Sequence, residues 1–249
     1  MEKRIYGKKF EINTEKTRML YNKRAENLDN MQSVYTSVLL GDQNPEYADE
    51  WDAAEKKLIL PFLNVSEESA VLDIGCGIGR WAECLMPVCK SYIGVDFSSE
   101  MTAAANKRCA GSVSDCKRFI CSSAQDYLSA PADGEKPNII IVSYVCMYIN
   151  DSEIENAFRN ILKKADRQCV LYFIDTVALN ERLTLNEIYS EALRSDYSAL
   201  YRTVDEYSQL FEIFTDAGFG KTDEGFMPKL NNEAQYSETD SHYTTLKKT

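Results

Sequence analysis

Residues 70–81 constrain the fold of this chain more than any other stretch. Ala70 to Ile74 form a short apolar run with one acid, a pattern typical of a buried strand. Glycines follow at alternate positions, Gly75, Gly77 and Gly79, before helical spacing resumes at residue 81. Glycine permits unusual backbone angles and a close approach of the backbone to a ligand. The run therefore predicts a strand, a tight ligand-binding loop and a helix.

The spacing of these glycines distinguishes between cofactors. A dinucleotide fingerprint requires glycines at the first, third and sixth places, and the sixth place from Gly75 is Arg80. This argues against a nicotinamide-dependent dehydrogenase. The pattern Asp-x-Gly-x-Gly-x-Gly of residues 73–79 instead resembles motif I of the class I S-adenosylmethionine-dependent methyltransferases. The next predicted strand ends at Asp96, where the resemblance implies an acid that holds the ribose hydroxyls.

The resemblance implies an α/β, Rossmann-like fold, with a seven-stranded, mainly parallel sheet and helices on both faces. It covers residues 66–249, and residues 1–65 are expected to form an N-terminal helical cap. Residues 177–207 follow the fifth predicted strand as a tyrosine-rich insert with helix-compatible periodicity and little glycine. In this family such an insert commonly forms the acceptor pocket or its lid.

The resemblance also implies which residues surround S-adenosylmethionine and its product S-adenosylhomocysteine. They belong to an N-terminal helix, the glycine loop and the ends of the second, third and fourth strands. The expected set is Tyr21, Asp73, Gly75, Cys76, Gly77, Gly79, Asp96, Phe97, Ser98, Met101, Ser123, Ala124, Gln125 and Ser143. An acid that often bonds the adenine is replaced by the sequence Ser123-Ala124-Gln125, which leaves open the side chain that recognises the base. Tyr21 is equally consistent with an aromatic at the edge of the core.

Methyl transfer from a sulfonium needs little chemistry from the protein, because orienting the acceptor can supply much of the rate. A hydroxyl acceptor benefits from a general base, whereas an amine has to arrive unprotonated. The candidate catalytic residues are Tyr148 after the fourth strand, Asp175 after the fifth, and His242, the only histidine. Each has a structural alternative: packing for Tyr148, turn capping for Asp175, and a strand position near the surface for His242.

The expected acceptor-binding residues are Met147, Tyr148, Tyr197, Tyr201 and Arg202. Many relatives have a histidine pair in place of the first two, so a histidine base is not assumed. Arg202 can form paired hydrogen bonds with phosphate or carboxylate, although it could equally attach the insert to the core. The resemblance favours methyl transfer to oxygen of a small polar acceptor, such as a sugar, a nucleotide sugar or a natural-product intermediate. The alternatives are a small amine acceptor and a non-catalytic regulatory protein that binds the cofactor.

Composition limits the partners. The net charge of −11 argues against nucleic acid and anionic lipid, which leaves a small-molecule acceptor, with monomer or homodimer undecided. No apolar run approaches the ~20 residues of a membrane span, and residues 1–9 lack a signal-peptide core, so a cytoplasmic protein is expected. Eight cysteines without a Cys-x-x-Cys pair predict no metal site.

Two helix starts are predicted from capping residues. Ser98 follows the second strand and can cap the helix that carries Met101. Ser152 and Glu155 have the spacing of a capping box before the helix after the fourth strand.

Overall fold

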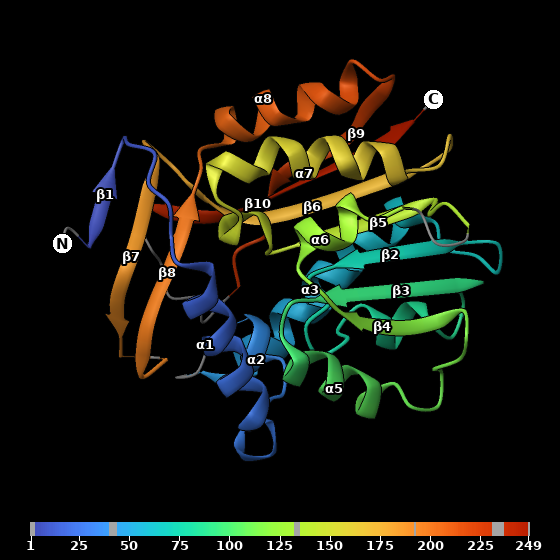
Figure 1. Ribbon diagram of the computed structural model, residues 1–249, viewed down its shortest axis with the longest axis horizontal. Coiled ribbons are helices and arrows are strands. Elements are labelled where there is room, and N and C mark those ends of the chain that lie inside the picture. The colour runs from blue at the N-terminus through green and yellow to red at the C-terminus, as the bar shows by residue number, and fades with distance from the viewer. Residues whose placement is uncertain (1–2, 40–43, 132–134, 192, 231–236, 249) are drawn as a thin grey trace.

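A computed structural model describes residues 3–39, 44–131, 135–191, 193–230 and 237–248 (Figure 1). Its main sheet contains seven strands: β2 (Ala70–Ile74), β3 (Ser91–Asp96), β4 (Lys117–Cys121), β5 (Ile139–Ser143), β6 (Val170–Ala178), β9 (Phe219–Phe226) and β10 (Thr239–Lys248). Their order is β4-β3-β2-β5-β6-β10-β9. The first five strands in this order are parallel, and β10 runs antiparallel to both β6 and β9. The expected mainly parallel, seven-stranded sheet is confirmed.

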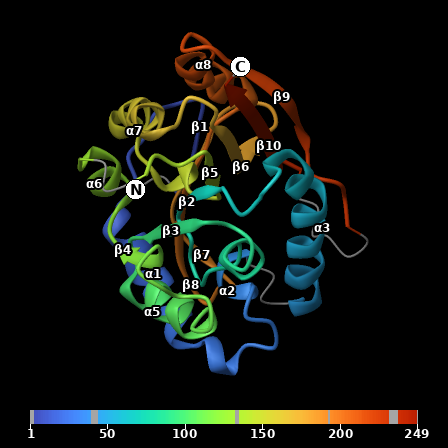
Figure 2. The same cartoon turned by 90° about the vertical axis from the view of Figure 1, so that its right-hand side faces the viewer.

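Helices cover both faces of this sheet, as Figure 2 shows. One face packs against α6 (Ala124–Ser129), α7 (Asp151–Lys164) and α8 (Val204–Thr215), and the other packs against α3 (Pro45–Leu63) and the short α4 (Ala82–Leu85). The alternation of side chains along a strand produces this arrangement, because Leu72 and Ile74 face α7 while Val71 faces α3. Helix α5 (Ser99–Arg108) packs beside β3 and β4.

The insert after β6 differs from the helical structure expected for it. It forms two antiparallel strands, β7 (Leu183–Ser190) and β8 (Ser195–Tyr201), which make a second sheet with β1 (Arg4–Tyr6). Two non-glycine residues provide the left-handed backbone that the hairpin needs: Glu187 has φ 50° within the irregular pairing, and Arg194 has φ 48° just before β8. A scarcity of glycine therefore did not exclude a hairpin.

The N-terminal region combines helices with this additional strand. After β1 come α1 (Thr14–Glu26), the 3₁₀ turn η1 (Leu28–Asn30) and α2 (Thr36–Leu39). Figure 1 shows β1 beside β7, and α1 near β8 and α5. A buried cluster joins α1 and β8 to η2 (Cys146–Tyr148), the short turn that follows β5. The cap, the insert and the main sheet therefore share one packed region.

The two predicted helix starts have different outcomes. The hydroxyl of Ser98 accepts a hydrogen bond from the backbone N–H of Met101 at 3.0 Å, so the predicted cap of α5 is confirmed. The capping box predicted at Ser152 is wrong. The N-cap of helix α7 lies two residues earlier, at Asn150, whose side chain makes no capping bond, and the helix begins at Asp151.

The eight cysteines are unpaired thiols, and five of them are buried. Among the described residues, no group of three or more histidine, cysteine or acidic side chains is placed to hold a metal ion. The helices in the described ranges include none with the length and apolarity needed to cross a membrane.

Candidate active site

A cavity of about 620 Å³ opens where the parallel strands β2, β3, β4 and β5 end, and α1 and α2 close it from the opposite side. Ligands of open α/β sheets bind at this edge, and the volume lies in the ordinary range for a small-molecule site. Many of the residues expected at the cofactor line it: Tyr21, Gly75, Cys76, Gly77, Asp96, Phe97, Met101, Ser123, Ala124, Gln125 and Ser143. Tyr148, from the catalytic and acceptor sets, lines it as well.

The glycine loop has a backbone shape that other residues adopt with strain. Gly75 and Gly77 have φ values of 74° and 53°. A Cβ atom on Gly75 would lie 2.1 Å from Cγ2 of Val145, and one on Gly77 would lie 2.8 Å from Cγ1 of Val38. The loop is fixed to the neighbouring strand because the N–H groups of Gly75 and Cys76 both donate to the carbonyl of Val95, at 2.7 and 3.0 Å.

Asp96 connects this loop to the start of α5. Its carboxylate accepts hydrogen bonds from the N–H groups of Gly77 and Ser98, each at 2.9 Å. Burial raises the pKa of Asp96 to about 6, although the two N–H donors act in the opposite direction. A carboxylate has about four acceptor positions, so Asp96 can accept further bonds from ligand hydroxyls while it holds the loop.

Beyond Asp96, the cavity runs past β4 to the start of α6. Ser123 caps α6, accepting from the N–H of Asp126 at 3.0 Å and donating to its carboxylate at 2.7 Å. Gln125 donates to Glu153 of α7 at 2.9 Å. These polar side chains are bonded to one another, while Phe97, Met101 and Ala124 give the cavity apolar surface. This part of the cavity suits a flat, partly apolar group.

A chain of tyrosine hydroxyls stands at the part of the cavity formed by α1 and η2. The hydroxyls of Tyr21 and Tyr148 lie 2.7 Å apart, and those of Tyr148 and Tyr197 lie 3.0 Å apart. Tyr201 donates to Tyr197 at 3.3 Å. Burial raises the pKa of Tyr148 well above its ordinary value, so the hydroxyl keeps its proton at neutral pH. Tyr197 and Tyr201, expected at the acceptor, stand behind Tyr148 and do not line the described cavity.

A buried ionic network beside the loop was not anticipated. Arg80 pairs with two acids of α3, Asp52 at 3.0 Å and Glu55 at 2.9 Å, and it donates to the hydroxyl of Ser143 at 3.0 Å. Tyr172 of β6 also donates to Glu55, at 2.8 Å. Arg80 and Ser143 line the cavity. The available signal was an arginine directly after the last loop glycine, together with two acids spaced for one face of α3.

Three residues expected at the cofactor support the cavity without lining it. Asp73 is 1% exposed within β2, where it accepts a hydrogen bond from the hydroxyl of Tyr92. Ser98 caps α5 as described. A Cβ atom on Gly79 would lie 3.2 Å from the sulfur of Cys109, so this glycine permits close packing against the end of α5. These positions determine the shape of the loop.

Asp175 holds the turn that carries Tyr148. Its carboxylate accepts from the N–H groups of Cys146 and Met147, at 3.1 and 3.4 Å. Burial raises the pKa of Asp175 to about 7, and those N–H donors oppose the shift. Asp175 and Met147 are outside the described cavity lining, and the bonds of Asp175 show that it supports the turn.

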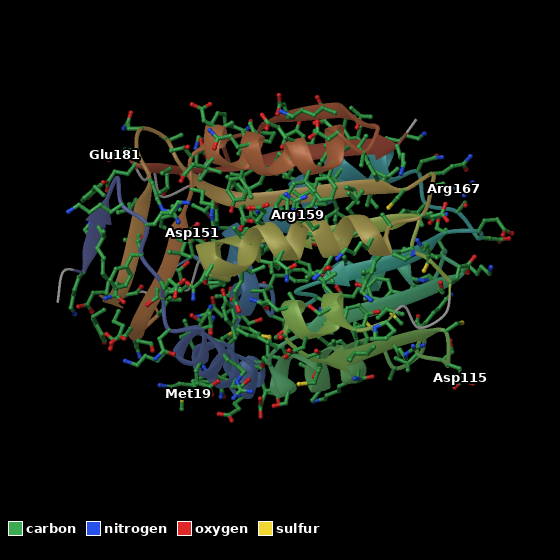
Figure 3. The ribbon with its side chains drawn as sticks, turned by 45° about the horizontal axis from the view of Figure 1, so that its top comes forward. Met19, Asp115, Asp151, Arg159, Arg167 and Glu181 are labelled. Atoms are coloured by element: carbon green, nitrogen blue, oxygen red, sulfur yellow. The ribbon has the colours of Figure 1, made fainter. Side chains whose placement is uncertain are left out.

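Arg202 binds the same turn, η2, through backbone carbonyl groups. It donates to the carbonyls of Cys146 and Ile149, at 2.8 and 2.7 Å, and to the carboxylate of Asp151. The side chain is 1% exposed and is enclosed by these protein groups, which supports the alternative that Arg202 attaches the insert to the core. Figure 3 shows Asp151 at the end of α7 that lies nearer the second sheet, with Arg167 toward the far end.

His242 does not reach the cavity. It lies on β10, and its ring packs edge-on against Phe226 with the ring centres 5.0 Å apart. Burial lowers its pKa. His242 is absent from the described lining, which supports the alternative of a strand residue without a catalytic role.

A family model described as a methyltransferase domain matches residues 71–165, which contain the glycine loop, Asp96 and Tyr148. The segment that holds most of the candidate site is thus similar to a methyltransferase domain. Solved structures with a similar fold include complexes with S-adenosylmethionine and with S-adenosylhomocysteine.

Two curated methyltransferases are similar in sequence to part of the chain. Phosphoethanolamine N-methyltransferase 3 of Arabidopsis thaliana is 30% identical over 117 residues, 47% of this chain and 23% of that enzyme. An uncharacterized methyltransferase of Bacillus pumilus is 28% identical over 155 residues, 57% of this chain and 66% of the relative. The chain thus spans less than two thirds of the length of either relative.

A solved structure supports the fold. Phosphoethanolamine N-methyltransferase 1 of Haemonchus contortus, in complex with phosphoethanolamine and S-adenosylhomocysteine, matches with a TM-score of 0.68 at 16% identity. The match covers 95% of this chain and 50% of that enzyme.

The cavity residues fit S-adenosylmethionine. Asp96 keeps acceptor capacity for two ribose hydroxyls, and the side-chain-free backbone at Gly75 and Gly77 permits close approach. Phe97, Met101 and Ala124 offer apolar surface for the base. Bound there, the cofactor supplies an activated methyl group.

Proposed function

We propose that this protein transfers a methyl group from S-adenosylmethionine to a small acceptor that reaches the same cavity. The observation that carries this proposal is Asp96, which holds the glycine loop and retains acceptor positions at the cavity. The chain's own contribution is to bind and orient the two reactants and to exclude water around them, since an activated methyl group needs little further chemistry.

The charges around the cavity favour an acceptor that is neutral or cationic in solution. The described lining contains four carboxylates, those of Glu15, Asp96, Asp126 and Glu153, and two arginines. Both arginines are already paired, Arg18 with Glu15 at 2.6 Å and Arg80 with the acids of α3. An anionic acceptor would compete with these pairs, whereas an amine would be attracted by the surplus carboxylates.

The protonation state of Tyr148 also favours an amine acceptor. Tyr148 keeps its proton because burial raises its pKa, and an uncharged phenol is a weak general base. An aliphatic hydroxyl would gain most from such a base during the transfer, whereas an amine attracted as an ammonium ion gives up its proton to solvent before the transfer and then needs no base. We therefore infer that a small amine is the acceptor, and the N-methyltransferases among the relatives are consistent with this inference.

This inference replaces oxygen with nitrogen as the expected acceptor atom. The oxygen preference relied on Arg202 to recognise a polar or anionic acceptor, and that guanidinium is enclosed by Asp151 and two carbonyls. Oxygen acceptors remain the competing outcome of the screen. A protein that binds the cofactor without turnover is the second competing outcome.

The first test is calorimetric titration with S-adenosylmethionine, S-adenosylhomocysteine and NAD. Binding of the two sulfur ligands without NAD supports the proposed cofactor, and no binding of either contradicts the proposal. An acceptor panel then follows, read by release of S-adenosylhomocysteine, and includes ethanolamine, phosphoethanolamine and matched alcohols and sugars. Turnover of ethanolamine but not of the alcohols supports an amine acceptor, whereas turnover of sugars alone contradicts it.

The Asp96→Ala substitution tests the central residue. It removes a charged acceptor from the ribose hydroxyls and two bonds from the loop, so cofactor binding should weaken by a few kcal/mol, at about 1.5–3 kcal/mol for each charged hydrogen bond. Asp115→Ala is the control, because Asp115 is exposed near β4 and outside the described cavity lining (Figure 3). Unchanged affinity in the Asp96 variant would remove this residue from the site.

A further inference from the structure

The segment that leads into α1 is attached to the main domain by one asparagine. The Oδ1 atom of Asn150 accepts from the N–H of Ile12 at 2.9 Å, and its Nδ2 atom donates to the carbonyl of Ile12 at 3.1 Å. One side chain therefore satisfies both backbone groups of a residue 138 positions away. Asn150 stands at the N-cap of α7 but makes no capping bond with its side chain. Both polar atoms of its side-chain amide are hydrogen-bonded to Ile12.

Fixing Ile12 fixes the start of α1. The next residue, Asn13, caps α1 by accepting from the N–H of Lys16 at 3.2 Å. Ile12 is 4% exposed and packs in the same buried cluster as Tyr21 and Tyr148. The anchor therefore determines where the first turns of the helix lie.

One face of α1 forms a wall of the cavity. Thr14, Glu15, Arg18 and Tyr21 all line it, while Met19 is 61% exposed on the outer side of the helix (Figure 3). A ligand enclosed between this wall and the glycine loop is retained for as long as α1 stays in place. The position of α1 therefore bears directly on the retention of the ligand.

Few other polar contacts join the first half of α1 to the rest of the described residues. Arg18 pairs with Glu15 of the same helix, and the pair of Lys16 with Glu187 of β7 is exposed. The hydroxyl contact between Tyr21 and Tyr148 lies two helical turns after Ile12. Exposed ion pairs contribute little, so the two partly buried bonds from Asn150 are the main polar attachment of this end within the described part of the chain.

We propose that Asn150 is a positioning residue, which holds α1 over the cavity and so determines how tightly the methyl donor and its product are retained. The proposal rests on the proposed function, because it requires those ligands to occupy the cavity. When only the closed arrangement retains ligand, the apparent Kd rises in inverse proportion to the fraction of closed molecules. Weakening the anchor lowers that fraction and speeds release.

The test uses two variants of the full chain, Asn150→Ala and Asn150→Asp. The alanine variant removes both bonds, and the aspartate variant keeps an acceptor for the Ile12 N–H but loses the donor to the Ile12 carbonyl. We expect the Kd for S-adenosylhomocysteine to rise about tenfold in Asn150→Ala and less in Asn150→Asp. The rise should come from faster dissociation of the ligand. Hydrogen exchange of residues 8–21 should accelerate in both variants without ligand.

Asn138→Ala is the matched control. Asn138 also bonds a distant main-chain group, because it accepts from the N–H of Ala70 at 2.9 Å, but it lies at the opposite end of β2 from the glycine loop. This variant should lose a comparable bond and keep the affinity of the parent.

The outcomes separate the two proposals. A Kd within twofold of the parent in both Asn150 variants overturns the positioning role, as does faster exchange spread evenly over the whole chain. Should Asn150→Ala fail to fold, Asn150→Asp decides by the same criteria. A parent that binds neither sulfur ligand contradicts the proposed function, whereas exchange at residues 8–21 still reports whether Asn150 anchors the helix.

Discussion

Tyr148 is the residue at which the cap, the main sheet and the insert meet. Its hydroxyl lies within hydrogen-bonding distance of Tyr21 on α1 and Tyr197 on β8, and its own turn follows β5. Its ring packs edge-on against those of Tyr21 and Tyr197. A single side chain thus connects three segments that are far apart in the sequence.

Removing this hydroxyl should reduce stability. In Tyr148→Phe, the buried hydroxyls of Tyr21 and Tyr197 lose a shared partner, and an unsatisfied buried polar group costs about 1–3 kcal/mol. We expect the free energy of unfolding to fall by that amount in urea titrations. Tyr189→Phe is the control, since Tyr189 is 51% exposed and should change stability little. Equal stability of the two variants would contradict a structural role for the hydroxyl chain.

The glycine loop is the element that depends most on local backbone shape. Gly75 combines a left-handed φ of 74° with a hypothetical Cβ that would lie 2.1 Å from Val145. Both conditions exclude a side chain without movement of the loop, and the loop shares its main-chain bonds with β3.

Gly75→Ala should therefore abolish measurable binding of S-adenosylhomocysteine, because either the loop or the end of β5 has to shift. Calorimetry checks this, with Gly111→Ala as a control at a position where a Cβ would meet nothing within 4 Å. The double variant Gly75→Ala with Val145→Ala separates the two causes. It relieves the collision but leaves the backbone strain, so we expect partial recovery. Wild-type affinity in Gly75→Ala would contradict the assigned shape of the loop.

The turn η2 is an element held by two buried charges of opposite sign. Asp175 accepts from its N–H groups, and Arg202 donates to its carbonyls and to Asp151. Asp151 also forms an ion pair with Arg182 of the insert. The insert is thereby joined to α7 through one carboxylate.

Arg202→Lys should destabilise the protein, because a lysine cannot reproduce the forked bonds to Asp151 and two carbonyls. Breaking a buried ion pair costs about 3–5 kcal/mol when one partner is removed, and we expect a loss toward the lower end because the charge is kept. Thermal and urea unfolding measure the loss. Arg159→Lys on the exposed face of α7 (Figure 3) is the matched control, since its pair with Glu155 is exposed. A loss no larger than that of the control would refute this role.

At the scale of the whole molecule, several carboxyl groups are buried inside the fold. Burial raises the pKa of Asp73 and Asp175 from 3.8 to about 7, although hydrogen bonds such as that from Tyr92 to Asp73 oppose the shift. In the unfolded chain these groups ionise near their ordinary pKa. Their contribution to stability is therefore fully present below about pH 4 and is lost as the pH rises to about 7.

We expect the stability of Asp73→Asn to fall less steeply between pH 4 and pH 7 than that of the parent. The expected difference in slope is up to about 1.4 kcal/mol per pH unit, the limit for one proton. Urea unfolding at several pH values measures both slopes. The exposed Asp115→Asn variant should keep the slope of the parent. Parallel slopes for Asp73→Asn and the parent would contradict the raised pKa.

The sequence by itself determined the strands of the main sheet, the glycine loop and the place of Asp96. These features follow from local patterns, since apolar runs, loop glycines and a serine cap at Ser98 act on backbone within a few positions of themselves. All of the expected cofactor residues that line the cavity, except Tyr21, lie between Gly75 and Ser143.

Only the tertiary structure decided which distant groups become partners. It turned the insert into strands beside β1, paired Arg80 with the acids of α3, enclosed Arg202 around η2, and placed His242 against Phe226. It also committed Asn150 to Ile12 instead of a helix cap. A charged or amide side chain can bond many partners, and its choice depends on burial and on which segments the packed sheet brings close together.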